Sequence, residues 1–324
     1  MNISPPFWHP ALSKGFILDW DGVLADTQLD FSPIRARYFN GERLPLVEAA
    51  GRLKASEREA LERDLYDLEM EGARKATPVR GSHELLEWLV SSGIPWAVVS
   101  RNCRDSIFEA ADRCGIELPG TVLSRDEGPL KPDPRALWAA AGSIKVDPGN
   151  CVMIGDFIYD LYGAIRAGMR AVLVERTEPG WERWADISFG RLEDMVSSLR
   201  DPEPLVTREY RELVGEKGRT WLDKAWGIEV SVPEESPEVF LVAMEAARLG
   251  IGRFGISGHS RISLEQWEEA PFLPISAVDS PMAECMSRTL RERYPQVSVS
   301  WSDYPRSLPE DPSLVERAIR SWLK

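Results

Sequence analysis

The sequence contains no apolar run that approaches the roughly 20 residues needed for a membrane-spanning helix. Its first ten residues, MNISPPFWHP, lack the basic stretch and following apolar segment of a signal peptide. The four cysteines form no CxxC pair and no zinc-binding spacing, so they indicate reduced thiols rather than a metal centre. From these absences we expect a cytoplasmic protein that does not engage membranes.

Positive charge is also in deficit. The chain has 39 Lys and Arg against 52 Asp and Glu, which gives a formal net charge of −13. A surface this acidic repels nucleic acid and anionic lipid, so we expect neither as a main partner. It also repels phosphorylated small molecules at long range, so a site for one would need a metal ion and local hydrogen-bond donors.

The pattern of apolar segments predicts an α/β protein. Length (324 residues) suits two domains, and 43% hydrophobic residues suffice for a packed core. Short apolar runs that indicate buried strands alternate with amphipathic helical patterns such as residues 82–91, and this order predicts a Rossmann-like, doubly wound parallel sheet. The expected strands are 15–19, 95–100, 151–154 and 171–174, with a weaker one at 121–123.

Two segments interrupt this alternation and predict further domains. Residues 28–77 are interpreted as a helical cap, in which the stretch 44–75 contains no strand signal and predicts two helices. The second helix is expected at roughly 56–76, with Ser56 and Glu59 as a capping box. Prolines 202 and 204 indicate a linker. We therefore expect a catalytic core formed by residues 1–27 and 78–200, the cap at 28–77, and a smaller α/β domain at 205–324. That last domain could be a ferredoxin-like sandwich or a small three-layer unit.

The strongest chemical signal is Asp19-Trp20-Asp21-Gly22, at the end of a predicted buried strand. The alternation of strand residues allows both carboxylates to reach one site while Trp20 points away. The competing interpretation is a surface strand end with two solvated aspartates.

Three weaker signals lie at or after other predicted strands. Ser100 ends the run PWAVVS, Lys131 lies in a proline-rich loop, and Gly155-Asp156-Phe157-Ile158-Tyr159-Asp160 begins a helix. A serine hydroxyl can donate to a phosphate oxygen, an ammonium can neutralise a carboxylate and a phosphate, and paired carboxylates suit Mg²⁺. Taken singly, each is more simply a turn serine, a solvated lysine or a pair of helix N-terminal aspartates. Their shared placement at strand ends predicts one site.

These segments resemble the four motifs of the haloacid dehalogenase superfamily, in its phosphoglycolate-phosphatase-like and β-phosphoglucomutase-like branch. The matching stretches are LDWDGVLADT, VVSRN, LKPDP and IGDFIYD, and the resemblance covers roughly residues 15–200, including a cap after the first motif. Trp20, Phe157 and Arg101 are bulkier than is usual at their positions. The C-terminal region resembles no family that we recognise.

The resemblance implies a role for each matching residue. Asp19 would be nucleophile and metal ligand, and Asp21 would be general acid and base with its backbone carbonyl on the metal. Asp156 would ligate Mg²⁺ with Asp160 in support. The phosphate-binding residues would be Ser100, Arg101, Asn102 and Lys131.

The expected activity is Mg²⁺-dependent hydrolysis of a small phosphorylated metabolite through an aspartyl-phosphate on Asp19. The presence of Asp21 disfavours dehalogenase activity, because the dehalogenases of this superfamily lack that acid. A phosphosugar mutase on the same core, and a phosphate-sensing or partner-binding regulatory protein, remain alternatives. Basic cap residues could contact substrate, although solvated ones are more usual, and the turn at residues 255–261 could hold an anion. These cap residues are Arg43, Lys54, Arg58, Arg63, Arg74 and Lys75.

Overall fold

The computed structural model describes residues 3–176, 180–232, 238–256, 260–269, 273–300 and 304–323. The chain divides into two compact units, a larger one of Pro10–Glu203 and a smaller one that combines Met1–His9 with Pro204–Lys324. The first residues thus group with the C-terminal region rather than with the core to which the sequence analysis assigned them. The cause is backbone pairing, because the N–H of Trp8 donates to the carbonyl of Leu205 at 3.0 Å and the reverse bond measures 3.1 Å.

The larger unit is built on a six-stranded sheet with the order β5-β4-β1-β6-β7-β8. Every neighbouring pair is parallel, and Ile17 of the central strand lies opposite Ala97 on one side and Met153 on the other. This confirms the expected α/β class. The strands are β1 Gly15–Leu18, β4 Trp96–Val99, β5 Val122–Leu123, β6 Cys151–Gly155, β7 Arg170–Leu173 and β8 Ile187–Ser188.

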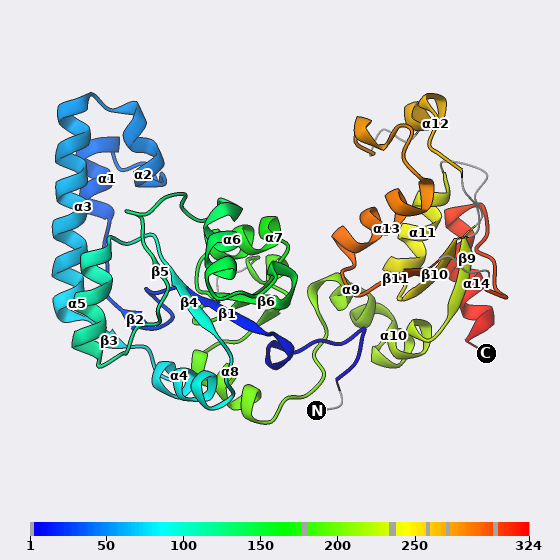
Figure 1. The fold of residues 1–324 in the computed structure, drawn as a ribbon, viewed down its shortest axis with the longest axis horizontal. Coiled ribbons are helices and arrows are strands. Elements are labelled where there is room, and N and C mark those ends of the chain that lie inside the picture. Colours follow the sequence, from blue (N-terminus) through cyan, green and yellow to red (C-terminus); the bar gives the residue numbers. More distant parts are fainter. Residues whose placement is uncertain are drawn as a thin grey trace. The chain divides into compact units, whose positions relative to one another are not determined.

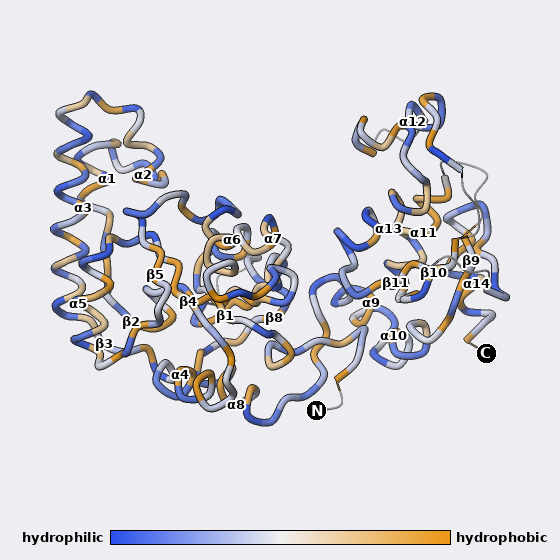
Figure 2. Tube along the Cα trace, viewed as in Figure 1, coloured by the Kyte–Doolittle hydropathy of each residue, from blue (hydrophilic) through white to orange (hydrophobic). Residues whose placement is uncertain are grey.

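Helices cover both faces of this sheet because successive strand residues point to opposite sides. Phe16 packs edge-on against Trp88 of α4, whereas Ile17 packs in a buried cluster with Leu137 of α6 and Leu161 of α7. Figure 2 shows the central strands mainly in the hydrophobic colours, as burial on both faces requires. The helices are α4 Ser82–Ser91, α5 Arg104–Cys114, α6 Pro134–Ser143, α7 Ile158–Ala167 and α8 Leu192–Arg200.

The cap follows β1 and contains more helix than expected. It comprises α1 Ser32–Phe39, α2 Leu46–Ala49 and the long α3 Ala55–Lys75, and the two-stranded ribbon of β2 Ala25–Asp26 and β3 Thr77–Pro78 joins it to the core. Figure 1 shows α3 running alongside α5.

The expected Ser56–Glu59 capping box is wrong, because α3 begins one residue earlier than expected. The carboxylate of Glu57 instead accepts the backbone N–H of Lys54 at 3.1 Å.

The smaller unit contains a three-stranded parallel sheet with the order β11-β10-β9. The ferredoxin-like alternative is therefore wrong, since that sandwich pairs its strands antiparallel. Phe254 lies in its buried core, while residues 257–259 of the suggested anion-binding turn lie outside the described residues. Its elements are α9 Arg208–Lys217, α10 Arg219–Trp226, β9 Glu229–Val232, α11 Glu238–Arg248, β10 Arg253–Ile256, α12 Leu264–Glu269, α13 Met282–Arg293, β11 Ser298–Ser300 and α14 Val315–Trp322.

Within the described ranges, no helix is both long and apolar enough to cross a membrane.

Candidate active site

Three neighbouring strands of the larger unit end at the same edge of the sheet. Asp19 follows β1, Ser100 follows β4 and Asp156 follows β6, and these strands lie side by side in the order β4-β1-β6. The chain leaves β1 toward β4 and later returns to the other side of β1 as β6. Ligand sites in open α/β sheets form at such a reversal, beyond the carboxyl ends of the strands.

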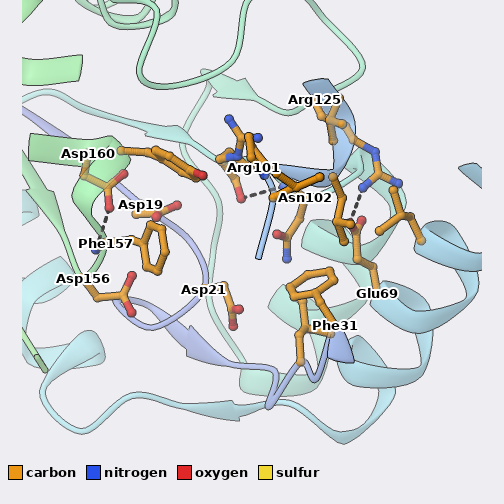
Figure 3. Close-up of a pocket in the computed structure, with 18 of the residues that line it drawn as sticks. Asp19, Asp21, Phe31, Glu69, Arg101, Asn102, Arg125, Asp156, Phe157 and Asp160 are labelled. Atoms are coloured by element: carbon orange, nitrogen blue, oxygen red, sulfur yellow. Dashed lines mark hydrogen bonds and ion pairs between the residues drawn. The ribbon is translucent and has the colours of Figure 1, made fainter. Parts of the chain in front are cut away.

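An acidic cluster occupies this edge. Carboxylate oxygens of Asp19, Asp156 and Asp160 all lie within 4.8 Å of one another. Lys131 enters the cluster from its loop, with Nζ 2.8 Å from Oδ1 of Asp19 and 2.7 Å from Oδ1 of Asp160. The Lys131 side chain is 1% exposed, and the structure brings these four expected residues together in a nearly dry environment (Figure 3 shows the three aspartates).

The cluster carries more negative charge than its cations balance. Burial, followed by the charges of Asp19 and Asp160, raises the pKa of Asp156 to about 8 despite Arg176, whose Nε lies 3.0 Å from Oδ2. Burial and then Asp19 raise the pKa of Asp160 to about 7, although Lys131 opposes this. Burial alone would lower the pKa of Lys131, but the carboxylates of Asp160 and Asp19 hold it above its usual value.

A divalent cation fits this donor set. Carboxylate oxygens are the ligands that Mg²⁺ prefers, and a bound cation would offset the repulsion that raises these pKa values. Asp19, Asp156 and Asp160 are the residues that could hold such an ion.

Asp21 lines the same cavity but makes different contacts. Its Oδ1 accepts the backbone N–H of Thr27 at 3.0 Å and also the hydroxyl of Thr27. Burial raises the pKa of Asp21 to about 6, despite these hydrogen bonds. The side chain is thus a carboxyl poised to exchange a proton near neutral pH.

Two glycines let the backbone approach the acidic cluster. Gly22 has φ +78°, and a Cβ there would lie 2.3 Å from Oδ2 of Asp156. At Gly155 a Cβ would lie 2.3 Å from the Asp160 side chain. Any larger residue would displace a carboxylate.

Ser100 and Asn102 line the cavity as expected from the sequence. The Ser100 hydroxyl oxygen accepts the Asn102 backbone N–H at 3.2 Å, and both residues are buried.

Arg101 makes contacts that the sequence analysis did not foresee. Its guanidinium forms a two-pronged ion pair with Glu48 of the cap, at 2.9 and 2.7 Å. It also donates to the carbonyl of Lys131 and lies 4.6 Å from the ring centroid of Tyr159. Arg101 therefore lines the cavity while it joins the cap to the core.

The cap supplies cavity residues that the sequence analysis did not single out. Glu69 of α3 is 3% exposed, accepts the backbone N–H of Cys103 at 2.7 Å and forms an ion pair with Arg125. Glu69 follows Leu61 and Leu65 at helical spacing. A carboxylate within this apolar stripe was therefore the sequence signal that could have identified Glu69 as a functional residue. Phe31 and Arg35 also line the cavity.

The six basic cap residues proposed as substrate contacts are exposed, and none lines this cavity. The solvated-face alternative therefore describes them better.

Comparison with known proteins gives related phosphatases and one dehalogenase. The N-acetylmuramic acid 6-phosphate phosphatase of Pseudomonas aeruginosa is 26% identical over 183 residues, which cover 50% of this chain and 81% of that protein. The phosphoglycolate phosphatase of Caulobacter vibrioides is 27% identical over 216 residues, which cover 59% of this chain and 86% of that protein. The (S)-2-haloacid dehalogenase 4A of Burkholderia cepacia is 28% identical over 149 residues, which cover 44% of this chain and 62% of that protein.

A solved structure and a family profile agree with these similarities. The crystal structure of a hydrolase from Pseudomonas syringae matches with a TM-score of 0.50 and 22% identity over 58% of this chain and 99% of that one, which supports the fold. The profile of the haloacid dehalogenase-like hydrolases matches residues 13–168. The larger unit therefore belongs to the haloacid dehalogenase-like hydrolase family.

Proposed function

We propose that the chain is a Mg²⁺-dependent phosphatase that hydrolyses a small phosphate monoester through a phosphoryl-enzyme intermediate on Asp19. The observation that carries the proposal is the convergence of Asp19, Lys131, Asp156 and Asp160 within one buried cluster beside Asp21. The names of the phosphatase relatives support the same reaction class.

In the first step, a carboxylate oxygen of Asp19 attacks phosphorus and the bond to the leaving oxygen breaks. Asp21 gives its proton to the leaving alcohol. Lys131 balances the charge on Asp19, and the hydroxyl of Ser100 and the amide of Asn102 are the donors proposed for the phosphate oxygens. Mg²⁺, when held by Asp19 and Asp156 with Asp160 in support, supplies charge neutralisation.

In the second step, Asp21 takes a proton from a water molecule, which attacks the phosphorus of the aspartyl-phosphate. The bond between phosphorus and Asp19 breaks, so inorganic phosphate leaves and both carboxyl groups return to their first states. The buried position of Asp21 and its pKa of about 6 suit this alternation between donor and acceptor.

Phosphate release from a panel of phosphate monoesters tests the proposal. We expect turnover in Mg²⁺, none in EDTA, and none in Asp19→Asn. Asp112→Asn is the matched control, because Asp112 is an exposed aspartate on α5. Activity that survives Asp19→Asn would refute the assignment of the nucleophile.

The same panel, extended with 2-haloacids and with a binding measurement, separates the alternatives. A phosphosugar mutase would interconvert sugar phosphates with little free phosphate, and a dehalogenase would release halide from 2-haloacids. A regulatory protein would turn over nothing while it bound a phosphorylated ligand or a partner.

A further inference from the structure

The catalytic cavity has two chemically different ends. Its volume is about 340 Å³, and the acidic cluster lies at one end. Figure 3 shows Phe31 on the far side of Asp21 from Asp156 and Asp160. Apolar cap residues line much of the remaining wall, beside the ion-paired side chains of Glu69, Arg101 and Arg125, and they are Leu29, Phe31, Leu44, Pro45, Leu46, Val47 and Leu65. The part of a ligand that extends away from the acidic cluster therefore meets these apolar side chains.

Most cations that line this cavity already have a carboxylate partner. Arg101 pairs with Glu48, Arg125 pairs with Glu69, and Arg176 pairs with Asp156. Each of these three guanidinium groups therefore already has a carboxyl partner within the protein.

Arg35 of α1 differs from them. Its Nε is buried without a hydrogen-bond partner, and its guanidinium forms no ion pair with any other described residue. The centroid of the Phe31 ring lies 5.6 Å from Cζ of Arg35, and the charge of exposed Asp30 interacts with that of the guanidinium. A buried donor without a partner is costly unless a ligand satisfies it. Among the described residues that line the cavity, Arg35 is therefore a cation from the cap whose buried Nε has no hydrogen-bond partner.

We propose that Arg35 binds a second anionic group on the substrate, so that the preferred ester has a phosphoryl group, a short apolar middle and a distal carboxylate or similar anion. This inference rests on the phosphatase proposal, because the acidic cluster must hold the phosphoryl end. It names a substrate class with a small apolar spacer rather than a polyhydroxylated sugar.

Pairs of synthetic esters test the inference. The phosphate monoesters of 3-hydroxypropanoic, 4-hydroxybutanoic and 5-hydroxypentanoic acid are each compared with the alkyl phosphate of the same chain length. The readout is the ratio of kcat/KM for the carboxylated ester to kcat/KM for its neutral partner. We expect this ratio to exceed one for at least one chain length in the unaltered protein.

Substitution of Arg35 should lower that ratio. For Arg35→Gln we expect a decrease of about 10- to 100-fold, the range for loss of a hydrogen bond to a charged group. Arg35→Lys should restore part of it, because the charge is kept while the forked geometry is lost. Arg37→Gln is the matched control on the same helix, since Arg37 is 63% exposed and pairs with Asp64, and it should leave the ratio unchanged.

Three results would overturn the inference. The first is a ratio at or below one for every chain length in the unaltered protein. The second is a similar loss on both esters of a pair in Arg35→Gln, which indicates a structural role. The third is an equal change of the ratio in Arg37→Gln. If the unaltered protein hydrolyses no ester of either kind, the phosphatase proposal itself fails and the inference falls with it.

Discussion

Replacing Lys131 with methionine tests the electrostatic account of the site. The Lys131 side chain is 1% exposed, and its ammonium group contacts two carboxylates, at 2.8 Å for Asp19 and 2.7 Å for Asp160. Methionine keeps most of the side-chain volume but leaves both carboxylates without their cation. Removing one partner of a buried ion pair destabilises a protein by about 3–5 kcal/mol. For a unit of this size that free energy corresponds to a fall in melting temperature of about 6–20 °C.

The size of the loss should depend on pH. Asp160 has a pKa of about 7 in the folded protein, above its reference value of 3.8. A carboxyl with a raised folded-state pKa contributes stability that is fully present below its unfolded pKa and is lost as pH rises through its folded pKa. Without Lys131 the pKa of Asp160 rises further, so this loss becomes larger and continues to higher pH. We therefore expect the full deficit of Lys131→Met at pH 8.5 and a clearly smaller one at pH 5.5, where Asp160 is protonated.

The assay is thermal unfolding of the full chain in EDTA at both pH values, with hydrogen exchange of β1 peptides to assign the transition to the larger unit. Lys14→Met is the control, because Lys14 is exposed in the same unit and its loss should change stability by less than about 0.5 kcal/mol. A deficit of the same size at pH 5.5 and 8.5, or one no larger than that of Lys14→Met, would refute the reasoning.

Three further outcomes are expected. Gly22→Ala should destabilise the larger unit by at least about 1 kcal/mol and weaken Mg²⁺ binding, because a residue with left-handed backbone angles gains a Cβ that would clash with Asp156. Melting curves and calorimetric titration with Mg²⁺ check these two effects. Glu48→Gln should change stability by less than about 1 kcal/mol, since the pair with Arg101 is partly solvated, yet it should raise KM, because that pair joins the cap to the core at the cavity. Unchanged steady-state kinetics would contradict the second part. Because the pKa of Asp21 is about 6, kcat/KM for alkyl phosphates should fall as pH rises above that value, whereas p-nitrophenyl phosphate, whose leaving group needs no proton, should be less affected; parallel pH profiles would contradict the acid role of Asp21.

The core could be predicted because its information is local. Apolar runs such as residues 151–154 are buried on both faces of a parallel sheet, so they are continuous in the sequence and easy to recognise. Alternation with helices then determines that the strands are parallel, and parallel strands end at one edge. Asp19, Ser100 and Asp156 could therefore be assigned to one edge before their distances were known.

The cap could not be predicted to the same extent because its helices depend on tertiary contacts. Helix α1, with the sequence SPIRARYF, has no apolar stripe at helical spacing, and its burial comes from Ile34 and Phe39 packing against residues of α2 and α3. The sequence does not indicate whether Arg35 or Arg37, two positions apart on this helix, faces the cavity. Glu69 was not singled out either, although its position four residues after Leu65 places a carboxylate in an apolar stripe that is visible in the sequence.

Arg101 illustrates why family membership gives the chemistry more readily than the substrate. The family resemblance implied a phosphate-binding role for Arg101, but its guanidinium contacts Glu48, more than 50 positions earlier in the chain. A carboxylate partner offsets the positive charge with which an arginine would attract a phosphate. Whether this cavity attracts an anionic group of a substrate therefore depends on which of its arginines are already paired with carboxylates. That pairing involves cap residues outside the four motifs, so a relative that shares Asp19 and Asp21 need not share it. Under the proposed function, the reaction is thus encoded in short local motifs, while the selection of the leaving group depends on long-range contacts between cap and core.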